Sequence, residues 1–509
     1  MKTIESAASL SNHPMQRLLT ALTLFVAQPL SFAAQTLERL PNIVFILADD
    51  QRDDSLGCEG HPVLRTPAID SLADTGVLFE NSFVTTPICW VSRAATLTGR
   101  TVRAHGQPTR IETVRSEVAN EMYPALLRNA GYRTAHFGKW HARMPEGFER
   151  STHFDEFRSI TGHPFFRKQS DGSLRHETQL IGDEALRFLE QAQPDQPFMM
   201  QLWFSAPHAQ DANKSPGMGH FPWPKSVPDD LYEDKSIAAP RLNDPELYEK
   251  HPDFLKRSIN RARFHWRWDT PEKYETNMRA YFRMISGIDL AVARVREKLA
   301  ALGLADNTVI IYSADNGYYL GDRGFAGKWT HYEESLRVPL IIHDPRSKPS
   351  ARGTRSDALV LNVDIAATLL DLAGAEVPAT YQGRSLLPFV RAERPADWRE
   401  QFFVEHVSVP PLLTWEGVRG SRYVYARYFD VLPPFEFLHD LERDPDQLQN
   451  LASSEKHQAV LRDMRERCQE RVMAYGGPLL PMSERYGRTI RTSEEERSAG
   501  PLQPTSQEK

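Results

Sequence analysis

The chain has 509 residues and a formal net charge of −6, and it is long enough for one large hydrophobic core and a smaller domain. Hydrophobic residues make up 40% of the chain and charged residues 25%, as in an ordinary globular protein. Because the charge is mildly acidic and no long basic run occurs, nucleic acid is not expected as a partner. Any selectivity for anions has to come from a local pocket.

The first feature in chain order has the pattern of an export signal. Residues 15–17 supply a short basic segment, residues 18–27 an apolar run, and residues 31–33 the small side chains of a cleavage site. We therefore expect residues 1–34 to be a signal peptide, with Met15 as an alternative start, and the mature protein to be periplasmic or secreted. Since no apolar run is long enough to span a bilayer, no stable membrane insertion is expected.

Apolar strands alternate with helices along most of the chain. Continuous apolar runs at residues 41–48, 198–205 and 308–314 are typical of parallel strands that are covered on both faces. Further strands are expected at residues 77–84, 134–138 and 339–343, and helices at residues 67–76, 121–130, 272–302 and 363–373. This alternation predicts an α/β fold built on a large layered sheet.

The pattern changes after about residue 392. Residues 417–428 and 435–441 alternate like antiparallel strands, and residues 454–473 have the pattern of an amphipathic helix. We therefore expect a large domain at residues 35–392 and a small α+β domain at residues 393–476. A mobile tail is expected at residues 477–509, where proline and charge dominate.

Oxygen-bearing side chains follow two of the predicted buried strands. Asp49 and Asp50 come directly after the first strand, and Asp315 and Asn316 come directly after the strand at 308–314. Ligand sites in α/β sheets gather at the carboxyl ends of the strands, so these side chains are expected to meet. Carboxylate and amide oxygens suit Ca²⁺ or Mg²⁺. With no cysteine or histidine cluster beside them in the sequence, zinc is less expected.

Basic side chains follow other predicted strands in the same way. Lys139 and His141 follow the strand at 134–138, and two positions apart on an extended segment they can face one pocket. His208 follows the strand at 198–205, and Lys328 lies just beyond the predicted metal segment. Each is weak evidence alone, because a single lysine or histidine on a loop is more often solvated.

Residues 89–100 read CWVSRAATLTGR and resemble the signature C-x-P-S-R-x-x-x-L-T-G-R of the type I sulfatases. Val91 departs from this signature, since the family has proline or sometimes alanine there. The strand-end segments match the same family in order and spacing, and the resemblance extends over about residues 41–452. It implies an alkaline phosphatase-like fold, with a large mixed sheet between helices and a small C-terminal α+β domain that contains an antiparallel sheet.

The resemblance also implies the cofactors and the groups that bind sulfate. In this family the cysteine is oxidised by a formylglycine-generating maturation enzyme, and the hydrate of formylglycine is the nucleophile. Arg93 would stabilise the ionised hydrate, while Lys139 and Lys328 would hold the sulfate oxygens. The metal would be Ca²⁺ rather than Mg²⁺. Its ligands would be Asp49, Asp50, the converted Cys89, Asp315 and Asn316.

The proton transfers implied by the resemblance involve three further groups. Asp315 would accept the proton of the attacking hydroxyl group. His208 would protonate the leaving alkoxide, with help from Lys328. His141 would deprotonate the second hydroxyl group, which expels sulfate and regenerates the aldehyde.

The resemblance predicts hydrolysis of sulfate monoesters, and export together with the arginine- and aromatic-rich run at residues 261–268 suggests sulfated carbohydrate as the substrate. The same run could instead pack its own aromatic side chains inside a long insertion. Two other functions stay open. One is a phosphonate monoester or phosphodiester hydrolase of the same superfamily. The other is a sulfoglycan-binding protein without catalysis, if Val91 prevents conversion of Cys89.

Overall fold

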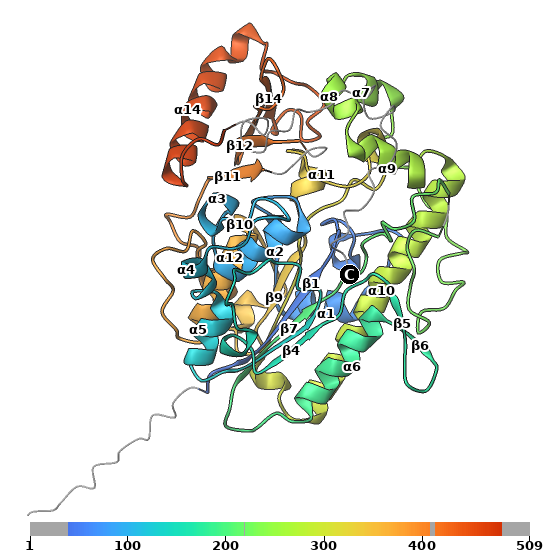
Figure 1. Cartoon of the computed structure of the whole chain (residues 1–509), viewed down its shortest axis with the longest axis vertical. Coiled ribbons are helices and arrows are strands. Elements are labelled where there is room, and N and C mark those ends of the chain that lie inside the picture. Colours follow the sequence, from blue (N-terminus) through green and yellow to red (C-terminus); the bar gives the residue numbers. More distant parts are fainter. Residues whose placement is uncertain (1–38, 218, 408–412, 481–509) are drawn as a thin grey trace, which may run out of the picture. The chain divides into compact units, whose positions relative to one another are not determined.

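The computed structural model describes residues 39–217, 219–407 and 413–480 (Figure 1). An eight-stranded sheet has the strand order β10-β2-β9-β8-β1-β7-β3-β4. Neighbouring strands are parallel except at β9, which runs antiparallel to β2 and β8. The strands of this sheet are β1 (Asn42–Ala48), β2 (Val77–Phe83), β3 (Arg133–Gly138), β4 (Glu156–Ser159), β7 (Phe198–Trp203), β8 (Thr308–Ala314), β9 (Leu340–His343) and β10 (Thr354–Leu361).

Strand β1 shows why the central strands are continuous apolar runs. All of its residues are buried, and alternate side chains point to opposite faces of the sheet. Ile43, Phe45 and Leu47 pack in one hydrophobic cluster, whereas Val44 and Ile46 belong to another. Because helices cover both faces, neither set of side chains reaches solvent.

The two faces of the sheet are covered by different helices (Figure 1). One hydrophobic cluster contains side chains of α1 (Pro67–Thr75), α6 (Glu177–Leu189) and α10 (Pro271–Ala301). The other contains side chains of α2 (Cys89–Thr98), α5 (Tyr123–Asn129) and α12 (Asn362–Leu372). The start of α10 has a local cause: Thr270 caps the helix by accepting a hydrogen bond from the Lys273 amide, and Pro271 occupies the first turn.

A second sheet follows in the C-terminal part of the chain. Its four antiparallel strands are β11 (Gln401–His406), β12 (Trp415–Gly420), β13 (Tyr423–Tyr428) and β14 (Phe435–Asp440). Helix α14 (Gln458–Ala474) packs on this sheet through Leu461, Met464, Cys468 and Val472.

The remaining elements are short and lie mostly in the connections. The helices are α3 (Val102–His105), α4 (Ser116–Ala119), α7 (Pro245–Glu249), α8 (Asp253–Lys256), α9 (Ile259–Arg267), α11 (Glu333–Leu336) and α13 (Leu387–Val390). A hairpin is formed by β5 (Phe166–Lys168) and β6 (Leu174–His176). The 3-10 turns are η1 (Gly57–Glu59), η2 (Arg150–Thr152), η3 (Ala305–Asn307), η4 (Asp322–Gly324), η5 (Pro349–Ala351) and η6 (Glu455–His457).

The predicted fold class is confirmed: a large mixed sheet lies between helices, and a small antiparallel sheet follows it. Among the elements that were not predicted are α6 and the edge strands β4 and β10. Residues from Leu40 onward form one compact unit, so the boundary near residue 393 stays a prediction. The three cysteines, Cys58, Cys89 and Cys468, are free.

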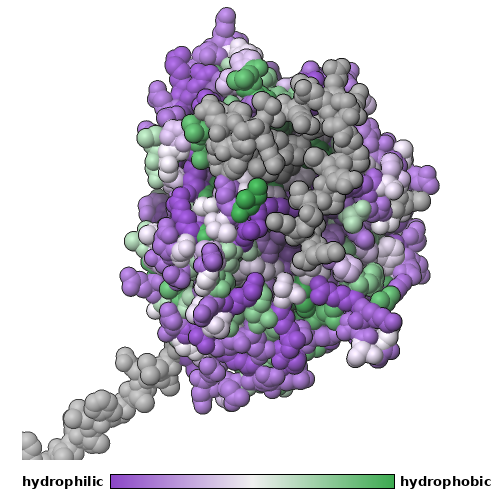
Figure 2. Space-filling view, in the orientation of Figure 1, coloured by the Kyte–Doolittle hydropathy of each residue, from purple (hydrophilic) through white to green (hydrophobic). Residues whose placement is uncertain are grey.

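Two predictions concern the ends of the chain and the membrane. The predicted export signal at residues 1–34 lies outside the described residues, as does the tail from residue 481 onward. Among the described residues, no helix combines the length and apolarity that crossing a bilayer requires. On the face shown in Figure 2, hydrophilic residues predominate and apolar ones form small groups.

Candidate active site

The acidic residues meet because their strands are neighbours in the sheet. Strands β1 and β8 pair in parallel with Ala48 opposite Ala314, so Asp49 and Asp315 leave the sheet side by side. The Asp315 amide donates to the Ala48 carbonyl at 3.0 Å, and the Asp50 amide donates to Asp315 Oδ1 at 3.3 Å. The predicted convergence of these carboxylates is therefore present in the structure.

The carboxylates form a cluster that fits a hard cation. Ligand oxygens of Asp49, Asp50 and Asp315 lie within 4.8 Å of one another, and all three residues are buried. Among the residues that the structure describes, Asp49 Oδ1, Asp50 Oδ2 and Asn316 Oδ1 are buried and have no hydrogen-bond partner. Buried polar atoms are normally satisfied, and a cation with oxygen ligands would satisfy these three together.

The acidic cluster also has a sulfur and a nitrogen neighbour in space. Asp49, Cys89 and His208 also offer ligand atoms within 4.8 Å of one another, so a cysteine and a histidine do lie beside the acids. Cys89 and His208 come from segments that are far from Asp49 in the chain, so the sequence alone does not show that they lie near it. However, Cys89 Sγ accepts from Lys328 Nζ at 3.3 Å, and His208 Nδ1 lies 2.6 Å from the Ala209 carbonyl oxygen. The unsatisfied atoms are oxygens, which suit Ca²⁺ or Mg²⁺ better than zinc.

Three basic side chains pair with the three carboxylates. Lys139 forms an ion pair with Asp49, and Lys328 forms one with Asp50. Arg93 Nε lies 2.7 Å from Asp315 Oδ2. Three positive charges therefore face three negative ones, and a divalent cation would leave a net charge of +2 for an anionic ligand.

Burial and neighbouring charges shift the pKa values of the site in different directions. Burial opposes ionisation of Asp49, but Lys139 and His208 hold its pKa well below the ordinary range. For Asp315, burial and the Asp49 charge raise the pKa to about 6, although Arg93 opposes this. Burial also raises the pKa of the Cys89 thiol. The thiol is therefore protonated at neutral pH and is a poor nucleophile without chemical conversion.

Cys89 is the first residue of α2, and Arg93 follows it by one helical turn. The Arg93 guanidinium donates to the carbonyls of Lys139 at 2.7 Å and Phe204 at 3.2 Å, and its side chain is fully buried. Arg93 therefore ties the cysteine helix to the ends of β3 and β7. These contacts go to carboxylates and loop carbonyls, and the predicted role of Arg93 toward the hydrate stays a prediction.

The end of β3 requires a glycine before Lys139. Gly138 has a φ angle of 124°, and a Cβ atom there would clash with the Trp203 carbonyl oxygen on β7. The same close approach lets the Lys139 amide donate to that carbonyl at 2.7 Å. Lys139 is thereby held beside the end of β1, where Asp49 begins.

The two predicted histidines have different surroundings. His208 Nε2 lies 3.5 Å from Asp50 Oδ2 and 3.9 Å from Asp211 Oδ2. Burial lowers the pKa of His208, while Asp50 and Asp49 oppose this effect. The ring of His141 contacts the Trp90 ring with 5.8 Å between centroids, and its Nδ1 is buried without a hydrogen-bond partner. Burial and Lys139 lower the pKa of His141, which keeps its ring neutral.

Hydrogen bonds, ion pairs and short contacts join all the predicted site residues except His141 into one network. Asp50 is the centre of this network, because Lys328, Asn316 and His208 all contact its carboxylate. His141 lies next to the network through Trp90, the neighbour of Cys89 in the chain.

Three loops around the network hold non-glycine residues in the left-handed region. Asp50 has φ 61°, His141 has φ 56° and Trp329 has φ 77°. Such conformations are uncommon, cost on the order of 1–3 kcal/mol each, and cluster at functional sites. Their gathering here supports a functional role for this end of the sheet.

Two acidic residues of the site were missed by the sequence argument. Glu177 begins α6 and accepts hydrogen bonds from the amides of Ser205 at 3.2 Å and Ala206 at 2.9 Å, at the start of the loop that carries His208. Asp211 contacts both His208 and arginines of α9. Neither acid belongs to a motif, so no local sequence signal could have found them.

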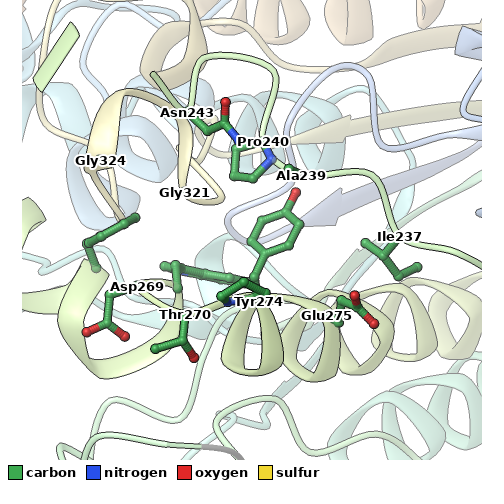
Figure 3. Close-up of a pocket in the computed structure, with 13 residues that line it drawn as sticks. Ile237, Ala239, Pro240, Asn243, Asp269, Thr270, Tyr274, Glu275, Gly321 and Gly324 are labelled. Carbon is green, nitrogen blue, oxygen red and sulfur yellow. The ribbon is translucent and has the colours of Figure 1, made fainter. Parts of the chain in front are cut away.

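A separate pocket of about 240 Å³ lies between the end of α9 and the start of α10 (Figure 3). Tyr274 rises from α10 toward Pro240, and Phe264 and Trp268 are also among its lining residues. The lining contains none of the predicted catalytic residues. Phe264 and Trp268 of the 261–268 run therefore line a pocket apart from the predicted catalytic residues, and the choice between the two interpretations of this run stays a prediction.

Comparison with protein families gives two matches. The family model named Sulfatase matches residues 41–375, which is more than half of the chain. The model named N-sulphoglucosamine sulphohydrolase, C-terminal, matches residues 321–473. The predicted family resemblance is confirmed by these matches.

Individual relatives extend over most of the chain. An N-acetylglucosamine-6-O-sulfatase of Bacteroides thetaiotaomicron is 29% identical over 495 residues, covering 84% of this chain and 86% of that protein. A solved structure of a protein in complex with its substrate D-glucosamine-2-N,6-O-disulfate superposes with a TM-score of 0.70 at 25% identity, covering 86% of this chain and 98% of the other. A phosphonate monoester hydrolase of Agrobacterium radiobacter superposes with a TM-score of 0.71 at 22% identity, covering 86% and 96%, and this likeness shows the fold alone.

Proposed function

Since the chain belongs to the sulfatase family and is a sulfuric ester hydrolase, we propose that it removes sulfate from a 6-O-sulfated glucosamine of the kind found in glycosaminoglycans. The relative at 29% identity is named for 6-O-sulfated N-acetylglucosamine. The solved neighbour at 25% identity binds a glucosamine that carries a 6-O-sulfate. Both names include a glucosamine with a 6-O-sulfate, and this shared feature supports the substrate that we propose.

The observation that carries the proposal is the single network of acids, bases and Cys89 at the carboxyl ends of the central strands. Lys328 contacts both Cys89 and Asp50, so the residue expected to become the nucleophile lies beside the acidic cluster. A sulfate ester placed there would meet Lys139 and Lys328 as cationic partners for its oxygens. A binding protein without catalysis would have no need of this arrangement.

We assign Ca²⁺ to the acidic cluster. The residues that would hold it are Asp49, Asp50, Asp315, Asn316 and the converted residue 89. When bound, a divalent cation would polarise the sulfate group as a Lewis acid. The three buried oxygens without hydrogen-bond partners support this assignment.

We assign formylglycine to position 89. As its hydrate this group would supply the hydroxyl that receives sulfate and later releases it as the aldehyde forms again. Cys89 is only 4% exposed and Val91 is fully buried in the folded chain, so a maturation enzyme would have to act before this segment folds. Conversion before or during export agrees with a periplasmic or secreted location.

The remaining roles concern protons and charge held by residues of the chain. Asp315 would accept the proton of the attacking hydroxyl group, and Arg93 fixes its carboxylate. His208 would donate a proton from Nε2 to the leaving alkoxide, since Nδ1 faces the Ala209 carbonyl. His141 would accept the proton of the second hydroxyl group through its unpaired Nδ1.

The proposal is tested by mass spectrometry and by sulfate release from the same preparation. We expect the peptide that contains Cys89 to carry an aldehyde, and we expect sulfate release from glucosamine 6-sulfate. The Cys58→Ala variant is the matched control, because Cys58 lies outside the network. An unmodified thiol with no sulfate release would contradict the proposal. Faster turnover of nitrophenyl phosphodiesters than of nitrophenyl sulfate would favour the phosphonate or phosphodiester hydrolase instead.

A further inference from the structure

Helix α9 carries an arginine pair beside the catalytic network. Arg263 and Arg267 are one turn apart and share a single carboxylate, that of Asp211. Arg263 Nη2 lies 2.7 Å from Asp211 Oδ2, and Arg267 Nη2 lies 2.9 Å from Asp211 Oδ1. Two positive charges therefore face one negative charge, which leaves one positive charge in excess.

The two arginines differ in how much of their hydrogen-bonding capacity the protein uses. Arg267 is fully buried, and its Nη1 donates to the Tyr318 hydroxyl at 3.1 Å, so only its Nε has no hydrogen-bond partner among the described residues, and it anchors the pair. The Arg263 side chain is 13% exposed, and its Nε and Nη1 are buried without a hydrogen-bond partner among the described residues. Unpaired donors of a charged group are costly when buried, and an anion that contacted Nε and Nη1 of Arg263 would satisfy both of them.

Arg263 is held close to the proposed proton donor and to the sulfate-binding lysine. Asp211 Oδ2, its ion-pair partner, also lies 3.9 Å from His208 Nε2. The Arg263 guanidinium lies over the Trp329 ring, 4.9 Å from its centroid, and Trp329 follows Lys328 in the chain. Burial disfavours the charge of Arg263, but Asp211 raises its pKa, so the guanidinium stays charged.

We propose that Arg263 binds a second anionic group, a sulfate or a carboxylate, of the substrate whose 6-O-sulfate is removed. This inference rests on the proposed function and adds the charge pattern that the enzyme selects. Asp211 and Arg267 are positioning residues, because they hold the guanidinium while Trp329 fixes its plane. The excess positive charge and the two free nitrogens match an oxyanion with several acceptor oxygens.

The test compares probes that carry one anionic group with probes that carry two. The probes are glucosamine 6-sulfate, glucosamine 2-N,6-O-disulfate, and a disaccharide in which glucosamine 6-sulfate is linked to an uronic acid. In the Arg263→Gln variant we expect kcat/KM for one of the two dianionic probes to fall about 10- to 100-fold more than for the monoanionic probe, mainly through KM. The probe with the larger loss identifies the second anion as sulfate or carboxylate.

Two further variants separate binding from folding and from indirect effects. Arg261→Gln is the matched control, since Arg261 is on the same helix but contacts Tyr248 and the Gly324 carbonyl, and it should change all probes equally. Arg263→Lys keeps the charge and should restore part of the selectivity. An effect transmitted through Asp211 to His208 would lower turnover of every probe alike, and that result, or no loss at all, would overturn the inference.

Calorimetric titration of the Cys89→Ala protein gives a readout that does not require turnover. We expect the preferred dianionic probe to bind about tenfold or more tightly than glucosamine 6-sulfate, and we expect this preference to vanish in the Cys89→Ala, Arg263→Gln double variant. If the dianionic probe binds more tightly but the protein without substitutions does not turn it over, the proposed chemistry is refuted and the anion contact is not. Turnover without preference would refute the contact alone.

Discussion

Glu177 supports the catalytic loop through its carboxylate, and removing that carboxylate should cost both stability and activity. Its Oε1 accepts hydrogen bonds from the Ala206 amide at 2.9 Å and from the Ser205 amide at 3.2 Å, in a fully buried setting. The Glu177→Ala change would leave two buried backbone donors unpaired. At about 1–3 kcal/mol for each of the two unsatisfied groups, we expect the free energy of unfolding to fall by about 2–6 kcal/mol.

The Glu177→Gln change is the matched control. The amide oxygen of glutamine can accept from both backbone donors as Oε1 does, so its cost should stay below about 1 kcal/mol. Burial raises the pKa of Glu177 to about 7, which means that the site already tolerates a neutral side chain.

Urea unfolding followed by tryptophan fluorescence measures the stability of both variants, and nitrophenyl sulfate turnover measures the placement of His208. We expect Glu177→Ala to lower kcat at least tenfold, on the order expected for a displaced proton donor. The interpretation fails if Glu177→Ala is as stable as the unchanged protein. It also fails if Glu177→Gln is as damaging as Glu177→Ala, because the negative charge would then matter rather than the acceptor.

Other changes test the nucleophile, the metal site and a buried acid. Cys89→Ala should abolish turnover while the far-ultraviolet circular dichroism spectrum and the melting temperature stay the same; remaining activity would refute the nucleophile assignment. Chelation of Ca²⁺ should abolish turnover, and Ca²⁺ should restore it in the unchanged protein but not in Asp50→Asn; recovery in that variant would remove Asp50 from the ligand set. Burial raises the pKa of Asp289 to about 7, and the Ile69 amide donates to this residue at 2.8 Å. Between about pH 4 and pH 7 the folded chain keeps a proton there that the unfolded chain releases, so the free energy of unfolding should fall by up to about 1.4 kcal/mol per pH unit as pH rises. Asp289→Asn should reduce this fall in urea titrations at pH 5 and pH 8, and an equal fall in both proteins would contradict the assignment.

The strand ends and the family resemblance together were sufficient to predict the acidic cluster. A buried parallel strand is an unbroken apolar run, so its last residue can be read directly, as at Ala48 and Ala314. Polar residues that follow such strands share one edge of the sheet wherever the strands are neighbours. The neighbour relation itself is not in the pattern, and here the family resemblance supplied it.

Elements and contacts that depend on distant pairing could not be predicted in this way. Strand β10 begins with exposed and half-buried residues, so it lacks the continuous apolar run of β1, although it pairs with β2 at the edge of the sheet. Glu177 lies 28 residues before Ser205, and its partners are backbone amides, which carry no sequence signature. The Cys89–His208 proximity likewise depends on the packing of α2 against the end of β7.

The arginines of α9 show the same limit within one helical turn. Arg263 and Arg267 have the same side chain, sit on the same face and share the same carboxylate, so the sequence gives no reason to treat them differently. The two arginines differ in their hydrogen bonds because different side chains lie next to their guanidinium groups. The Tyr318 hydroxyl accepts a hydrogen bond from Arg267 Nη1, so only Nε of Arg267 is unpaired among the described residues. The Trp329 ring lies at a face of Arg263, and both Nε and Nη1 of Arg263 are unpaired. Tyr318 and Trp329 both follow β8, the strand that also delivers Asp315. One segment thus supplies a proposed metal ligand, a partner that anchors Arg267 and a ring that lies at a face of Arg263, which is why anion selectivity should be coupled in space to the proposed catalytic network.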